Sequence, residues 1–251
     1  MIEIRELRKR YRSFVAVDGV SLTVPRGSLY ALLGSNGAGK TTTIKCLAGL
    51  LRPSGGQVLV GGIDLAREPA AAKRRMGYVP DRPFLYDKLS GAELIAFMAE
   101  LFGLDPAGVA ARARPLLEAF ELTGWEDELI EAYSYGMRQK LVLSAVLARE
   151  PEALVIDEPI VGLDPRAAKT LRELLGERAR AGTAILMSTH SLAIAEQVAD
   201  RIGIIAGGRL VAEGSLAELR SLAALEGSGL EDVFLALTRA EPQPPAASAG
   251  S

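Results

Sequence analysis

The 251-residue sequence predicts an α/β fold with a mostly parallel sheet and an inserted group of helices. Three observations support this fold class. Short apolar segments alternate with helix-compatible segments toward both ends of the chain, which is typical of a parallel sheet covered by helices. A glycine-rich loop, residues 34–39, joins one apolar segment directly to a helix-compatible one. Between residues 90 and 149, β-branched runs give way to alanine, leucine and glutamate, which favours helices.

The first 88 residues contain apolar alternation and short apolar runs that predict strands. The expected strands are residues 2–7, 20–24, 29–33, 57–60 and 76–79, and a helix is expected over residues 42–50. A turn is expected at Pro25-Arg26-Gly27, and Pro53-Ser54-Gly55-Gly56 should end the helical region.

The helical insert should begin at Ser90, because Ser90 followed by Glu93 three residues later has the pattern of a capping box. The insert is expected to hold helices over residues 92–102, 107–120 and 136–149, and Pro151 should close it. The α/β alternation then resumes. The remaining expected elements are strands 153–156 and 183–188, helices 167–180 and 192–199, a hairpin of 202–205 with 209–212, and helices 215–225 and 230–238.

Composition limits the classes of protein that the chain can belong to. Hydrophobic residues make up 49% and charged residues 24%, which are ordinary values for a globular protein with a core. The formal net charge is −2, so we expect no nucleic-acid partner, because such domains are basic. Cys46 is the only cysteine, so no intrachain disulfide forms, and this usage fits a reducing compartment. Without a signal peptide or an apolar run of about 18 residues, the protein should be soluble and reach a membrane only by docking.

The glycine-rich loop carries a specific chemical pattern, Gly34-x-x-x-x-Gly39-Lys40-Thr41. This is the P-loop pattern, in which glycines let backbone N–H groups approach the phosphates of a nucleotide. Lys40 should reach the β- and γ-phosphates, and the Thr41 hydroxyl should ligate Mg²⁺. The loop residues expected to bind the nucleotide are Ser35, Asn36, Gly37, Ala38, Gly39, Lys40, Thr41 and Thr42.

A second pattern places two adjacent carboxylates at the end of the apolar run 153–156. A buried strand that ends in this way directs Asp157 toward a metal ion. Glu158 is then placed to act as the general base for a water molecule that attacks the γ-phosphate. By itself the pattern is equally compatible with a solvated acidic turn, and the P-loop upstream favours the catalytic interpretation.

Together these motifs resemble the ABC ATPase family over about residues 2–220. Residues 157–165 are similar to that family's Walker B motif followed by its D-loop, and residues 133–140 lie where the family has its signature, usually Leu-Ser-Gly-Gly-Gln. Ser134 and Gly136 match this signature. His190, the only histidine, is similar to the family's switch histidine. Tyr11 lies where the family has an aromatic residue that stacks on adenine.

The resemblance implies an ABC ATPase core with an amino-terminal antiparallel β region and a helical signature subdomain. The implied domains are residues 1–88 with 150–220 as the ATP-binding lobe, 89–149 as the signature subdomain, 221–239 as a helical extension, and 240–251 as a disordered tail. It further implies that ATP and Mg²⁺ bind between two ATPase subunits. Asp157, Thr41 and Asp81 would then hold the metal, and Ser134, Gly136 and Asp164 would contact nucleotide.

The implied partner is an integral membrane permease, with the chain cytoplasmic and peripheral on the inner face of the cell membrane. Closure of an ATPase dimer around ATP would drive movement of the permease. The permease would dock near Asp81–Leu104, where Pro83-Phe84-Leu85-Tyr86 offers apolar side chains. The late segment Leu230–Leu237 is similar to subunits that serve type-2 ABC exporters.

The chain departs from the family pattern at two positions. Asp81 stands where the family's Q-loop has glutamine, and an ionised carboxylate cannot donate the hydrogen bond that an amide donates. Tyr135 replaces a signature glycine and adds bulk near the expected nucleotide contact. These changes favour either a slower site or pairing with a different ABC ATPase, so homodimer and heterodimer both stay open. The alternatives to a transport ATPase are a soluble ABC assembly factor and a module that senses ATP without hydrolysing it.

Overall fold

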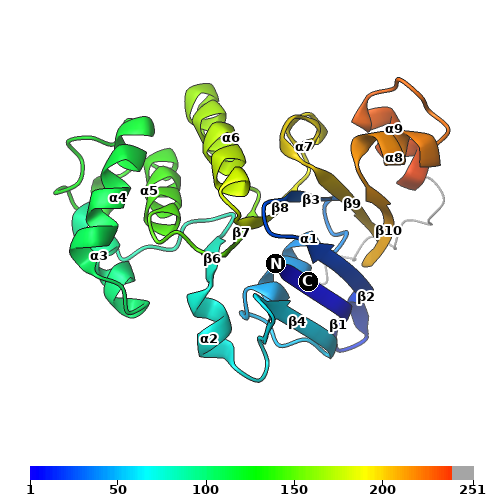
Figure 1. Cartoon of the computed structure of the whole chain (residues 1–251), viewed down its shortest axis with the longest axis horizontal. Coiled ribbons are helices and arrows are strands. Elements are labelled where there is room, and N and C mark those ends of the chain that lie inside the picture. Colours follow the sequence, from blue (N-terminus) through cyan, green and yellow to red (C-terminus); the bar gives the residue numbers. More distant parts are fainter. Residues whose placement is uncertain (239–251) are drawn as a thin grey trace, which may run out of the picture.

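The computed structural model describes residues 1–238 (Figure 1). The predicted disordered tail, residues 240–251, and residue 239 of the predicted extension lie outside the described residues. Within residues 1–238, no helix is both long enough and apolar enough to cross a membrane.

A six-stranded sheet forms the centre of the molecule, in the order β10-β9-β3-β8-β7-β6. Its strands are β3 (Leu29–Leu33), β6 (Met76–Val79), β7 (Ala153–Asp157), β8 (Ala184–Thr189), β9 (Arg201–Ala206) and β10 (Arg209–Gly214). All neighbouring pairs are parallel except β9 with β10, which form an antiparallel hairpin about Gly207 and Gly208. The prediction of a mostly parallel sheet is therefore confirmed.

A second sheet has the order β2-β1-β4-β5 and is antiparallel throughout. Its strands are β1 (Ile2–Tyr11), β2 (Phe14–Val24), β4 (Gly55–Val60) and β5 (Ile63–Asp64). This sheet is the amino-terminal antiparallel region that the family resemblance implied. In Figure 1 it lies below the central sheet, with the blue strands β1 and β2 beside β4.

The central sheet separates two apolar cores, and β3 contributes to both because successive side chains of a strand point to opposite faces. Leu29, Ala31 and Leu33 pack into a core shared with the helical insert and with helices α6 (Pro165–Arg180) and α7 (Leu192–Val198). Tyr30 and Leu32 pack into the other core with helix α1 (Lys40–Leu47) and the antiparallel sheet. Burial on both faces explains why β3, β7 and β8 are continuous apolar runs.

The helices surround these sheets, with the insert at one end of the molecule and the last two helices at the other (Figure 1). They are α1 (Lys40–Leu47), α2 (Pro69–Arg74), α3 (Gly91–Leu101), α4 (Pro106–Ala119), the 3₁₀ helix Ile130–Ala132, α5 (Tyr135–Leu147), α6 (Pro165–Arg180), α7 (Leu192–Val198), α8 (Leu216–Leu222) and α9 (Leu230–Thr238). The capping box is confirmed, since the Ser90 hydroxyl accepts from the Glu93 N–H and the Glu93 carboxylate accepts from the Ser90 N–H. How the chain divides into functional subdomains stays a prediction.

Several element boundaries and the smallest elements differ from the sequence-based predictions. The largest differences are that β1 ends at Tyr11, not at residue 7, and that β2 begins at Phe14, not at residue 20. Helix α1 begins at Lys40, not at residue 42, and it ends at Leu47 because Gly49 adopts a left-handed φ of 67°. Helix α8 ends at Leu222, three residues before the predicted end, because Ala224 has a φ of 54°. The two-residue β5 and the six-residue α2 are too short for a periodic pattern to reveal them.

Candidate functional site

The P-loop connects β3 to α1, and the structure explains its glycines. Gly37 and Gly39 have φ values of 82° and 109°, where L-residues with a side chain are strained. A Cβ atom at Gly34 would lie 2.5 Å from the Ile205 carbonyl oxygen, and one at Gly39 would lie 2.7 Å from the Ala16 carbonyl oxygen. One face of the loop is therefore packed tightly against the Ile205 and Ala16 carbonyl groups, and its opposite face is open. Its N–H groups and the positive end of α1 form an anion-binding surface there.

A cavity of about 410 Å³ opens in front of this loop, a volume within the range of small-ligand pockets. Its lining comes from the antiparallel sheet, the P-loop, the start of α1 and the chain segments that follow strands of the central sheet. The lining residues are Tyr11, Phe14, Ala16, Ser35, Asn36, Gly37, Gly39, Lys40, Thr41, Thr42, Asp81, Glu158 and His190. The structure thus brings together most of the residues that were predicted from widely separated motifs.

Lys40 is the most buried cation of the pocket, with 5% of its surface exposed. Its ammonium group donates to the carbonyl oxygens of Gly34 at 2.8 Å and Ser35 at 3.3 Å, and it lies 3.8 Å from a Glu158 oxygen. Burial lowers the pKa of Lys40, and the carboxylates of Glu158 and Asp157 act in the opposite direction. A phosphate group in front of the loop would add a strong charge-assisted partner to this ammonium group.

Asp157 ends β7 and is fully buried directly behind the pocket. Its Oδ1 atom accepts hydrogen bonds from the Ser188 hydroxyl and, at 3.5 Å, from the Thr41 hydroxyl. Its Oδ2 atom is buried and has no hydrogen-bond partner, and burial raises the pKa of the carboxyl group. A carboxylate oxygen left free beside a threonine hydroxyl fits a Mg²⁺ ion, which binds proteins through one or two carboxylates plus substrate phosphates.

Glu158 follows Asp157 in a left-handed conformation with a φ of 49°, which costs about 1–3 kcal/mol for a residue of this kind. Its N–H group donates to the Ser188 carbonyl and lies 3.2 Å from the Ser188 hydroxyl. One carboxylate oxygen lies 2.9 Å from Nδ1 of His190, and the other faces Lys40. The strained backbone turns the side chain out of the sheet and into the pocket, between a cation and an imidazole.

Ser134, Gly136 and Asp164 do not line the pocket. The Ser134 hydroxyl caps α5 by accepting from the Met137 N–H, and Asp164 caps α6 while it accepts from the Lys140 ammonium group at 2.8 Å. The bond from Lys140 lowers the pKa of Asp164 to about 2. Two other predicted residues lie just behind the pocket, since Ala38 is buried within the loop and Asp157 contacts Thr41.

Residues 17–161, more than half of the chain, match the family model of the ABC transporter. The chain belongs to the ABC transporter family. It is 41% identical over 220 residues to the daunorubicin/doxorubicin resistance ATP-binding protein DrrA of Streptomyces peucetius, an alignment that covers 88% of this chain and 67% of DrrA. It is 37% identical over 214 residues to a Nod factor export ATP-binding protein I of Burkholderia lata, over 85% of this chain and 70% of that protein.

A solved structure described as the ATP-binding subunit of an ABC transporter superposes on the chain with a TM-score of 0.91. The two are 36% identical, and the superposition covers 94% of this chain and 99% of that one. The chain is therefore an ATP-binding and ATP-hydrolysing subunit of an ABC transporter. The predicted family, fold and ATPase activity are confirmed, and a transport ATPase is favoured over a soluble assembly factor. The family match contains the P-loop and Glu158, whereas Tyr11 and His190 lie outside it.

Two residues of this ABC transporter site were not predicted from the sequence. Phe14 lines the pocket opposite Tyr11, with which it pairs across the β1–β2 hairpin. An aromatic residue at each side of a two-residue turn was the available signal. Ser188 holds Asp157 and Glu158 in place because the parallel register of β7 and β8 sets it beside Asp157. This register follows from the packing of the strands and has no short motif.

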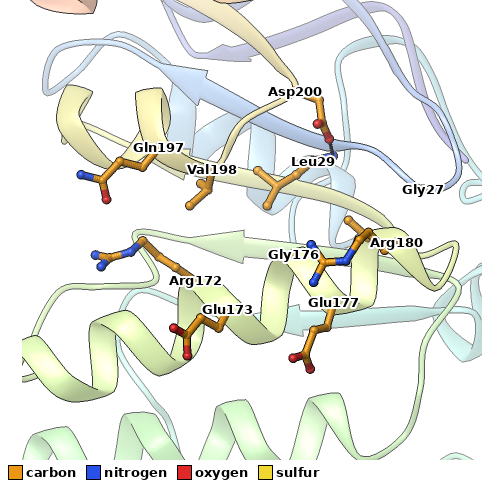
Figure 2. A pocket seen from close by; sticks show the side chains of 11 residues that line it. Gly27, Leu29, Arg172, Glu173, Gly176, Glu177, Arg180, Gln197, Val198 and Asp200 are labelled. Atoms are coloured by element: carbon orange, nitrogen blue, oxygen red, sulfur yellow. Dashed lines mark hydrogen bonds between the residues drawn. The ribbon is translucent and has the colours of Figure 1, made fainter.

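A second cavity, of about 550 Å³, lies between α6 and α7 (Figure 2). Figure 2 shows charges of both signs along it, with Arg172 and Arg180 near Glu173 and Glu177. The Asp200 carboxylate at its edge accepts from the Leu29 N–H at 2.7 Å. This cavity is larger than the pocket at the P-loop, but it contains none of the predicted site residues. It is not the nucleotide site of this ABC transporter subunit.

Proposed function

We propose that the P-loop pocket hydrolyses Mg²⁺-ATP with Glu158 as the general base, and that this reaction drives export through a separate membrane permease. The observation that carries the proposal is the convergence of Lys40, Glu158 and His190 on one cavity in front of the P-loop. Phosphoryl transfer requires positioning and charge neutralisation more than covalent chemistry, and this cavity offers both.

Each part of ATP has a matching group in the pocket. Tyr11 would stack on adenine, and its ring is partly exposed at the edge of the cavity. The N–H groups of residues 35–42 would bind the phosphates, together with Lys40. Thr41 and Asp157 would hold Mg²⁺ directly and Asp81 through water, and the ion would supply positive charge to the β- and γ-phosphates. The free Oδ2 atom of Asp157 supports this assignment.

The catalytic step would depend on the contacts of the Glu158 carboxylate. With Nδ1 of His190 at 2.9 Å from one oxygen and Lys40 at 3.8 Å from the other, the carboxylate has a defined orientation. In this orientation Glu158 would accept the proton of the water molecule that attacks the γ-phosphate. Lys40 would stabilise the negative charge that develops on the β-phosphate of the leaving ADP as its bond to the γ-phosphorus breaks.

The complete site would require a second ATPase subunit, either a second copy or a different ABC ATPase. Ser134, Gly136 and Asp164 lie outside the chain's own pocket, as expected if they act on nucleotide held by the other subunit. We propose that residues 89–149 act as the signature subdomain and that residues 1–88 with 150–220 act as the ATP-binding lobe. Residues 221–238 would form the helical extension of this lobe.

The permease would bind the apolar surface near Asp81–Leu104, which includes the segment before the helical insert and helix α3. Phe84 is 97% exposed, and Tyr86 packs edge to face on Phe97 with the ring centroids 5.6 Å apart. Leu101 is also exposed, whereas Leu85 packs against the core. Exposed apolar clusters of this kind mark protein-protein contacts. This docking would place the chain on the cytoplasmic face of the membrane, and the drug resistance and export named for its relatives support export as the direction.

Two measurements test the proposal. Purified chain should hydrolyse ATP in the presence of Mg²⁺, and Glu158→Gln should lower kcat by about 10²–10⁴-fold while ATP binding persists. A tagged chain purified from native membranes in mild detergent should bring down a polytopic membrane protein near two-to-two stoichiometry. Full turnover by Glu158→Gln would disprove the catalytic assignment, and recovery of the chain with soluble partners alone would disprove the permease assignment.

A further inference from the structure

Tyr135 joins three separate segments of the chain next to the nucleotide pocket. It is the first residue of α5, and its hydroxyl group donates a hydrogen bond of 2.7 Å to the backbone carbonyl of Asp81. Its ring lies directly on Gly162, because a Cβ atom built at Gly162 would overlap two carbons of that ring. A glycine at position 135 could make neither contact.

Both contacted segments lead directly to the pocket. Asp81 follows the end of β6 and lines the cavity. Gly162 lies in the loop between Glu158 and Asp164, four residues after the proposed base, and its φ of 81° marks a sharp turn there. The Val161 N–H donates to the Glu158 carbonyl at 3.2 Å. Movement of this loop would therefore displace the backbone of Glu158. Tyr135 itself does not line the cavity.

We propose that Tyr135 is a positioning residue for ATP hydrolysis, which fixes Asp81 and the loop after Glu158 against the amino end of α5. This inference rests on the catalytic role proposed above for Glu158. Through the two contacts, the helical insert and the two pocket-forming segments move together. The side chain that replaces a signature glycine therefore lies against its own chain. Its function is to keep the two pocket-forming segments in a fixed position relative to the insert.

The surroundings of Tyr135 favour positioning over a role in the stability of the fold. The residue is 42% exposed and belongs to neither apolar core. Substitutions at exposed positions outside the apolar cores usually change the free energy of unfolding little. Removal of the hydroxyl should therefore affect the rate of hydrolysis more than the stability of the protein.

The first variant is Tyr135→Phe, which removes only the hydroxyl group. We expect kcat for ATP hydrolysis to fall about fivefold, which corresponds to about 1 kcal/mol, the usual contribution of one neutral hydrogen bond. The KM for ATP should stay within about twofold, because no group that binds ATP has changed. The matched control is Thr183→Val, which removes a hydroxyl that donates to the Pro151 carbonyl at 3.4 Å, away from the pocket. That variant should leave kcat unchanged.

A double-mutant cycle tests the ring contact independently. Gly162→Ala places a methyl group in the Tyr135 ring and should lower kcat, and Tyr135→Gly removes the ring. If the contact positions the loop, the double variant should turn over ATP at least threefold faster than the product of the two single effects predicts. Additive effects, or wild-type kcat in Tyr135→Phe, would overturn the inference. Glu158→Gln is measured in parallel. If this variant loses turnover, the role of Glu158 as the base holds, and a negative result for Tyr135 then contradicts the positioning role alone.

Discussion

The unpaired oxygen of Asp157 leads to a prediction about stability as well as activity. Asp157 is fully buried, its Oδ2 atom has no partner, and burial raises its pKa. A buried carboxylate with an unsatisfied oxygen is unfavourable unless an ion compensates it. The substitution Asp157→Asn keeps the shape of the side chain and an oxygen that can accept from the Ser188 and Thr41 hydroxyls, and it removes the charge.

The size of the effect follows from these contacts. An unsatisfied buried polar group costs about 1–3 kcal/mol, and the neutral amide, which still lacks a partner, should recover about 1–2 kcal/mol of that cost. For a protein of this size, 1 kcal/mol corresponds to about 2–4 °C in melting temperature. In EDTA and without nucleotide, Asp157→Asn should therefore melt about 2–8 °C above the wild type. With Mg²⁺-ATP the order should reverse, because only the carboxylate binds the ion strongly.

Thermal denaturation by circular dichroism, with and without Mg²⁺-ATP, measures both effects. ATP in EDTA serves as the control for nucleotide binding that does not need the metal. Ser188→Ala is a matched variant, because it removes a hydrogen-bond donor to Asp157 and should lower the melting temperature in EDTA. A melting temperature of Asp157→Asn below that of the wild type in EDTA would show that the carboxylate is stabilising without metal, and the reasoning would fail.

Three further predictions concern the pocket. Tyr11→Ala should weaken binding of a fluorescent ATP analogue by about 5–150-fold, as expected for loss of about 1–3 kcal/mol of stacking. Tyr11→Phe should bind like the wild type, and equal loss in both variants would exclude stacking. His190→Ala should lower kcat by at least tenfold in a steady-state phosphate-release assay with little change in KM, and an unchanged kcat would show that the contact to Glu158 is not needed. Asp81→Gln should raise kcat if the amide restores the family's contact, and a fall would indicate that the carboxylate has its own role at the metal.

The sequence predicted most of the pocket because each motif is short and locally constrained. Gly34 and Gly39 are required by backbone contacts that any side chain would violate, so the P-loop pattern is specific. Glu158 and His190 were predicted from their positions at the ends of apolar strands, and β7 and β8 do bring them to the same edge of the sheet. A parallel sheet places the carboxyl ends of its strands together, so the motifs converge as soon as the strand order is right.

The residues that the sequence did not reveal depend on long-range packing. Ser188 meets Asp157 through the register of two strands that are separated in the chain by helix α6. The sequence motif also did not predict the direction of the Tyr135 side chain. It indicated only that this side chain adds bulk near a nucleotide contact. In the structure the ring packs on Gly162 of its own chain. Contacts of this kind are made by rotamers and by neighbouring loops, and neither has a signature in the sequence.

The two departures from the family pattern, Asp81 and Tyr135, are joined by one hydrogen bond. This contact uses the backbone carbonyl of Asp81. The carboxylate accepts from the Arg82 N–H at 2.9 Å and lies at the pocket, where its charge helps to raise the pKa of Asp157. A glutamine at position 81 would keep the carbonyl and therefore the link to Tyr135, whereas a glycine at position 135 would lose the link whatever residue stands at 81. The two substitutions should thus be unequal in effect, with the connection between insert and pocket depending on Tyr135 and the chemistry at the metal depending on Asp81.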